Sequence, residues 1–121
     1  MVLFQLTDAA RLKLYDEYFL CMKVGHLGQC LDLYGLEDIM DVAIETRDNS
    51  VAMARLLACH RLKTAVPAAC MARMGAIIGG GTERQVETLG LYFEGIGLGF
   101  QVIDDVINLR GIVKVRTETG A

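Results

Sequence analysis

The sequence lacks a run of apolar residues long enough to cross a membrane. Its longest stretches without an acidic or basic side chain have nine residues each, at Thr64–Ala72, Met74–Thr82 and Gly95–Ile103. A membrane-spanning helix needs about 20 predominantly apolar residues. We therefore expect no membrane span.

A surplus of basic residues is also missing. The 12 Lys and Arg residues are outnumbered by 15 Asp and Glu residues, which gives a formal net charge of −3. Proteins that bind nucleic acids present a basic face to the phosphates. We therefore expect no nucleic-acid partner.

The cysteines lack the spacing of a metal site or a redox motif. The chain has four of them, and no two form a Cys-x-x-Cys pattern: Cys21, Cys30, Cys59 and Cys70. All four lie in segments with a helical pattern, which favours free buried thiols in a reducing compartment over disulfides or metal ligands. The expected location is cytoplasmic.

Apolar residues, in contrast, are abundant. They make up 53% of the 121 residues, charged residues make up 22%, and the mean hydropathy is +0.36. This composition excludes a disordered chain. The mean hydropathy is also high for a small domain, whose surface is large relative to its volume. We therefore expect some helices to bury apolar faces against protein outside this chain.

The spacing of the apolar residues predicts an all-α fold. They recur at intervals of three and four in three long segments, at about 8–33, 50–78 and 82–110, with a short connecting helix between the first two. No segment alternates apolar and polar residues as a strand would. Each long segment is preceded by residues that can cap a helix N-terminus, which are Thr7 or Asp8, Asn49 or Ser50, and Thr82.

Proline and glycine mark where the predicted helices bend or end. Pro67, the single proline, removes a backbone donor inside the second helix and predicts a kink near Lys63–Thr64. The glycines at 79–81 predict the end of that helix. Gly111 predicts the end of the third, because residues 112–121 have no helical pattern.

The sharpest candidate for chemistry is the pair Asp104-Asp105 in an otherwise apolar helix. At 100° per residue, the two carboxylates share a stripe about 100° wide with Gln101 and Asn108. Buried carboxylates need partners, and Mg²⁺ suits them because it prefers oxygen ligands and bridges to substrate phosphates. A solvated patch near the helix end is the alternative that the spacing leaves open.

A second polar stripe lies in the first predicted helix. Gly25, Gly28, Gln29 and Asp32 follow one another at helical spacing on one face. Each glycine costs about 1 kcal/mol relative to alanine in a helix, so two on one face suggest that another helix or a ligand approaches closely. Tight helix packing, with Gln29 and Asp32 in solvent, remains the alternative.

The third candidate is Lys63-Thr64, at the expected kink. A lysine supplies a positive charge and a threonine a short donor, which together can bind a phosphate. A solvated surface lysine is the alternative. We interpret His26 and His60 as histidines at the edge of the core. The glycine runs follow no predicted strand and lack the lysine of a phosphate-binding loop, which excludes that motif.

In their order and separation, these motifs resemble the trans-isoprenyl diphosphate synthases, the polyprenyl synthetase family. The similarity covers about residues 25–111 and rests on Gly28-Gln29-Cys30-Leu31-Asp32-Leu33, Lys63-Thr64-Ala65, Gly79-Gly80-Gly81, Gly99-Phe100-Gln101-Val102-Ile103-Asp104-Asp105 and Asn108-Leu109-Arg110-Gly111. The last two motifs are most similar to those of geranylgeranyl diphosphate synthases. Many family members have a third aspartate where this chain has Asn108.

The resemblance implies a helical bundle around a deep cavity and a Mg²⁺-dependent condensation of an allylic diphosphate with isopentenyl diphosphate. It also implies roles for individual residues. Asp104 and Asp105 correspond to the second aspartate-rich motif, which holds metal, and act in catalysis with Lys63. By the same resemblance, Lys63 and Thr64 are expected to bind the allylic diphosphate. Gln29, Asp32 and Gln101 are polar substrate-binding residues of the cavity.

The chain also departs from the family pattern. A family enzyme is more than twice as long, and no first aspartate-rich motif or arginine pair precedes Gly25. Residues 1–121 are therefore interpreted as one partial isoprenoid-synthase domain, whether a C-terminal-half fragment, a split-gene product or a degenerate paralogue, that is inactive alone. We expect a homo-oligomer, most simply a dimer, or pairing with a chain that supplies the N-terminal half.

A different functional class also fits these motifs. It is a non-catalytic partner subunit that modulates a full-length prenyltransferase. A terpene cyclase ranks last, because that class lacks the combination of the Lys-Thr motif with the Phe-Gln-x-x-Asp-Asp motif.

Overall fold

The computed structural model describes residues 5–119, with side chains up to residue 111. Its elements in chain order are α1 (Asp8–Tyr34), α2 (Glu37–Thr46), α3 (Ser50–His60), the π-helical turn η2 (Arg61–Ala65), α4 (Val66–Ile78) and α5 (Glu83–Thr119). No strand occurs between residues 5 and 119. The expected all-α fold is confirmed.

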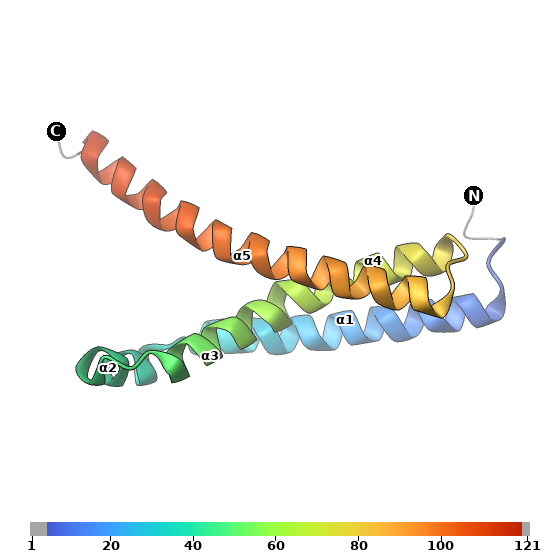
Figure 1. Cartoon of the computed structure of the whole chain (residues 1–121), viewed down its shortest axis with the longest axis horizontal. Helices are drawn as coiled ribbons and strands as arrows, with labels where there is room; N and C mark the ends of the chain where they lie inside the picture. The colour runs from blue at the N-terminus through green and yellow to red at the C-terminus, as the bar shows by residue number, and fades with distance from the viewer. Residues whose placement is uncertain (1–4, 120–121) are drawn as a thin grey trace.

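Three long rods make up the molecule (Figure 1). One is α1, the second is the continuous path of α3, η2 and α4, and the third is α5. Within the second rod, α4 packs on both α1 and α5. Beyond this packed part, α5 diverges from the other helices toward its C-terminal end (Figure 1). No helix in the described part of the chain is long and apolar enough to span a membrane.

Side chains cap the helices where the sequence predicts it, with one change. The hydroxyl of Thr7 accepts from the backbone N–H of Ala10 at 3.1 Å, and Thr82 and Gln85 cap each other reciprocally at 2.9 and 3.2 Å. The side chain of Asn49 makes no capping hydrogen bond. Instead, Asp48 accepts from the N–H of Ser50 at 3.0 Å, and this bond lowers the pKa of Asp48.

The predicted interruption of the second helix is confirmed as a π-helical turn. Pro67 has no N–H, so it cannot bond to a carbonyl of the preceding turn. One residue earlier, the N–H of Val66 bonds to the carbonyl of Arg61, five residues back. The turn is therefore wider than in an α-helix, and Lys63 and Thr64 lie within it.

The predicted end of the third helix at Gly111 is wrong. Helix α5 continues to Thr119, and residues 120–121 lie outside the described part. The glycines that follow α1 and α4, Gly35 and Gly80, have positive φ values of 80° and 75°, the conformation in which glycine ends a helix. Gly111 does not adopt it, so it remains helical at a cost of about 1 kcal/mol.

The core consists of small side chains. Within the described part, the buried apolar residues are Ala52, Cys59, Ala65, Ala69 and Cys70. Large apolar side chains of α5 stay exposed instead, among them Phe100, Ile103 and Leu109, each at 60% or more. Small residues let the three rods approach closely, while the outer faces of the rods lack a covering layer.

The cysteines are all free. Cys59 and Cys70 are buried as expected, and burial raises the pKa of the Cys70 thiol to about 11. Cys21 is half-buried. The expectation of a buried thiol is wrong for Cys30, which is exposed because it lies on the face of α1 that no other helix covers.

The close packing at Gly28 gives a test of the fold. A Cβ atom at Gly28 would lie 2.4 Å from the backbone nitrogen of Lys63. Gly28→Ala is therefore expected to lower the free energy of unfolding by about 2–3 kcal/mol. Gly99→Ala is the matched control, because a Cβ atom there would meet nothing within 4 Å beyond the backbone of its own helix and its two chain neighbours, and it should raise the same quantity by up to about 1 kcal/mol. Urea unfolding followed by circular dichroism measures both, and equal effects would contradict the packing described.

Candidate functional site

The candidate site lies where α1, η2 and α5 meet. Gly28 of α1 faces the backbone of Leu62 and Lys63. On the other side, a Cβ atom at Gly97 of α5 would lie 3.0 Å from the Cα atom of Ala65. The two glycines thus allow both helices to touch the backbone of η2. Side chains of this turn can therefore reach α1 and α5 directly.

Lys63 connects η2 to α1. Its Nζ donates to Oδ2 of Asp32 at 2.7 Å, and this hydrogen bond raises the pKa of Lys63. The two side chains are 36% and 46% exposed, so water screens the pair and it contributes little to stability. What the contact provides is a fixed, accessible positive charge beside a carboxylate.

Thr64 connects η2 to α5. Its hydroxyl donates to Oε1 of Gln101 at 2.8 Å, and Nε2 of Gln101 points to Oδ1 of Asp105 at 3.5 Å. With its oxygen accepting from Thr64, the amide of Gln101 presents its NH₂ group to the carboxylate. The two sequence motifs, Lys-Thr and Phe-Gln-x-x-Asp-Asp, are therefore in direct contact.

His60 is the site residue that the sequence interpretation missed. Its Nε2 lies 2.7 Å from Oδ2 of Asp105, so it does more than fill the edge of the core. It precedes Lys63 and Thr64 by three and four residues, a spacing at which side chains of a regular α-helix are neighbours. That spacing was the available signal. His26, in contrast, is exposed and bonds only to the carbonyl of Met22 in its own helix.

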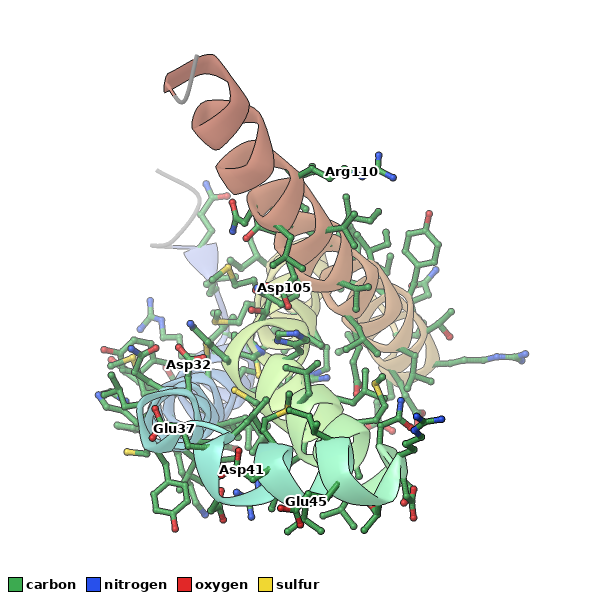
Figure 2. All side chains as sticks on the ribbon, turned by 90° about the vertical axis from the view of Figure 1, so that its left-hand side faces the viewer. Asp32, Glu37, Asp41, Glu45, Asp105 and Arg110 are labelled. Carbon is green, nitrogen blue, oxygen red and sulfur yellow. The ribbon has the colours of Figure 1, made fainter. Side chains whose placement is uncertain are left out.

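The two adjacent aspartates have different surroundings. Asp105 contacts His60 and Gln101, whereas Oδ2 of Asp104 accepts, among the described side chains, only from Asn108 of its own helix, at 3.4 Å. Asp32 and Asp105 come from different helices, α1 and α5, while Glu37, Asp41 and Glu45 follow the separate helix α2 (Figure 2). The structure thus joins five of the seven predicted site residues by side-chain hydrogen bonds, in two groups that meet at η2: Asp32 and Lys63, and Thr64, Gln101 and Asp105.

The other two predicted residues are less tightly integrated. Asp104 is half-buried next to the network and is not part of it. Gln29 is exposed, and none of the hydrogen bonds of the site involves it. Gln29 comes one residue after Gly28, which is about 100° around the helix from the contact with η2. This rotation leaves its side chain exposed.

The donor set suits a metal that is shared with a ligand. Among the described residues, no three His, Cys, Asp or Glu side chains are grouped closely enough to hold a metal ion by themselves. Mg²⁺ commonly takes only one or two carboxylates and completes its shell with phosphates and water. Asp104 and Asp105 supply two carboxylates in adjacent positions of α5, which is the number that such a shared ion needs.

A buried thiol lies beside the site. Cys59 Sγ is 3.7 Å from the carbonyl of Gly28 and 3.9 Å from Oδ1 of Asp32. Burial is the main reason that the pKa of Cys59 is raised, and the charge of Asp32 raises it further. A raised pKa disfavours the thiolate, which is the nucleophilic form of a cysteine.

The sequence matches the family model described as polyprenyl synthetase over residues 2–117. It is similar to the large subunit 1 of a heterodimeric geranylgeranyl pyrophosphate synthase, chloroplastic, from Arabidopsis thaliana, with 36% identity over 71% of this chain and 24% of that protein. The geranylgeranyl pyrophosphate synthase 11, chloroplastic, of the same plant is 44% identical over 54% of this chain and 18% of its own length.

A mitochondrial relative, geranylgeranyl pyrophosphate synthase 6 of Arabidopsis thaliana, is 37% identical over 67% of this chain and 22% of its own length. The chain therefore spans less than a quarter of the length of these relatives. No solved structure gives a significant match.

The burial of Cys59 predicts slow modification of its thiol. With iodoacetamide at about pH 8, Cys59 should react at least about tenfold more slowly than the exposed Cys30, because burial limits both access and thiolate formation. Mass spectrometry of the digested protein measures each rate. In urea the two rates should converge, which provides the control. Equal rates in the folded protein would contradict the described packing of Cys59 against α1.

Proposed function

The chain belongs to the polyprenyl synthetase family, and we propose that it is one portion of an isoprenyl diphosphate synthase. The proposed reaction is a prenyl transfer of the geranylgeranyl type, in which an allylic diphosphate condenses with isopentenyl diphosphate. One observation carries the proposal. Three motifs that are far apart in the sequence meet at η2 through the bonds of Lys63 with Asp32 and of Thr64 with Gln101.

Lys63 is proposed to bind the allylic diphosphate. Its hydrogen bond to Asp32 raises its pKa further above neutral pH, and its partial exposure leaves the ammonium group accessible. A doubly phosphorylated ligand carries more negative charge than one carboxylate and can therefore compete for the lysine. Thr64, Gln101, Asp32 and Gln29 are proposed as polar substrate-binding residues around it.

Asp104 and Asp105 are proposed to hold Mg²⁺ together with the diphosphate. The metal, when bound, would neutralise negative charge that develops on the departing diphosphate. The chain's own contribution is the link between Asp105 and the turn that carries Lys63, through Gln101 and Thr64, and we propose that these cationic and anionic groups meet the same ligand. Such prearranged charges lower a barrier without reorganisation during the reaction. Lys63, Asp104 and Asp105 are accordingly the proposed catalytic residues.

The proposal includes sequence outside this chain. Because this chain spans less than a quarter of the length of its relatives, we propose that activity needs further sequence, from the same protein, from a second copy or from another chain. A non-catalytic subunit that modulates a complete prenyltransferase is the second candidate. Its support is the name of a relative that is one subunit of a heterodimeric synthase.

The proposed compartment is a reducing one, because all four cysteines are free. The cytoplasm is the location proposed from the sequence. The names of the relatives give the chloroplast and the mitochondrion for those proteins.

Removal of one carboxylate tests the proposed metal site. Titration calorimetry with Mg²⁺ and inorganic pyrophosphate should show that Asp104→Ala binds pyrophosphate at least about tenfold more weakly than the unchanged chain, because a shared ligand is lost. Mg²⁺ without pyrophosphate should bind weakly to both. Asp41→Ala, which removes an exposed carboxylate from α2, is the matched control. Unchanged affinity in Asp104→Ala would contradict the metal assignment.

Sedimentation equilibrium tests the proposed assembly. The exposed apolar side chains of α5 include Phe100, Ile103 and Leu109, and burying them at about 25 cal/mol per Å² favours association. At micromolar concentration the chain should therefore sediment above its monomer mass of 13.3 kDa, most simply as a dimer. A monomer with the full helical circular dichroism signal would contradict this expectation.

A further inference from the structure

His60 is a buried polar side chain at the junction of α3 and η2. It is 7% exposed, and it is the one polar or charged residue classed as buried within the described part of the chain. A polar group in such a place costs free energy unless it is hydrogen-bonded. Its bond to Asp105 satisfies the ring and directs it to a residue of the acidic pair.

The geometry fixes the roles of the two partners. A carboxylate can only accept a hydrogen bond, so Nε2 of His60 carries the proton that it donates. The second oxygen of Asp105 faces the amide of Gln101 at 3.5 Å, which Thr64 holds in turn. Asp105 is thus held on both oxygens, from α3 on one side and from its own helix on the other.

The neighbouring Asp104 has no such support. Its contact is with Asn108, four residues along the same helix, at 3.4 Å. One carboxylate of the pair is therefore fixed by a separate helix, while the other can adjust its rotamer to a ligand. His60 is also joined through the chain to Lys63, three residues later, so the same turn sets the positions of Lys63 and Asp105.

We infer that His60 is a positioning residue, which fixes Asp105 relative to Lys63 so that both meet one metal-bound diphosphate. The inference rests on the proposed function. Side chains that hold a metal ligand in place without touching the metal commonly change affinity by about 10- to 100-fold when they are removed. His60 has the geometry for that role.

Substitutions of His60 that differ in reach test the inference. His60→Gln puts an amide NH₂ group near the position of Nε2, whereas His60→Asn keeps an amide that is too short to reach Asp105. His60→Leu removes the donor altogether. His26→Leu is the matched control, because His26 is exposed and bonds only within α1. Circular dichroism establishes that each variant is folded.

Titration calorimetry of the whole chain with Mg²⁺ and inorganic pyrophosphate is the measurement. His60→Asn and His60→Leu should bind pyrophosphate about tenfold more weakly than the unchanged chain, while His60→Gln should stay within about threefold of it. His26→Leu should bind as the unchanged chain does. The difference in pyrophosphate affinity between Gln and Asn is the decisive result, because only Gln can reach Asp105, and it is compared between variants that circular dichroism shows to be folded alike.

Two outcomes would overturn the inference in distinguishable ways. If His60→Asn binds as tightly as the unchanged chain while Asp104→Ala binds weakly, His60 does not position the site, and the proposed function stands. If the unchanged chain binds no pyrophosphate in the presence of Mg²⁺, the proposed function fails, and the inference that rests on it fails as well.

Discussion

The contact between Gly28 and the backbone of η2 is the constraint on which the site depends. No side chain fits between α1 and this turn, because a Cβ atom at Gly28 would lie within 2.4–2.7 Å of three backbone atoms. Gly97 permits a similar approach from α5. Because η2 touches a helix on each side, both its long side chain, Lys63, and its short one, Thr64, reach a neighbouring helix. The π-helical geometry, set where Pro67 provides no N–H, determines which residues of the turn face which helix.

The polar network follows from that close packing. Because these helices approach the backbone of η2 closely, Lys63 reaches Asp32 at 2.7 Å and Thr64 reaches Gln101 at 2.8 Å. The side chains of the network differ in burial: His60 at one end is buried, whereas Lys63 and Asp32 at the other end are partly exposed to solvent. The buried end holds Asp105 in position, and the exposed end offers charge to a ligand. This division is consistent with a site that must be rigid and still accept a substrate from solvent.

The same small-residue core leaves the outer faces uncovered. A core of alanine, cysteine and glycine brings three rods together but cannot bury the phenylalanine, isoleucine and leucine side chains of α5. This chain spans less than a quarter of the length of its relatives, so additional helices from the rest of such a protein or from a partner are the natural cover for those faces. The geometry around η2 is nevertheless formed within this chain, because every contact in it joins residues 28–105.

The sequence alone determined the all-α class, the positions of the long helices, the kink before Pro67 and the motifs of the family. These properties depend on local spacing, on caps such as Thr82 and on the missing N–H of proline, all of which act within a few residues. It misjudged Gly111, because a glycine ends a helix only where it adopts a positive φ, which composition does not specify. Only the tertiary structure decided that Asp105, and not Asp104, is held by His60, and that Asp32 joins the network while Gln29 does not. Which of these side chains meet depends on which helices lie against η2 and on which of their residues face it. Packing between residues more than 30 positions apart in the chain sets both.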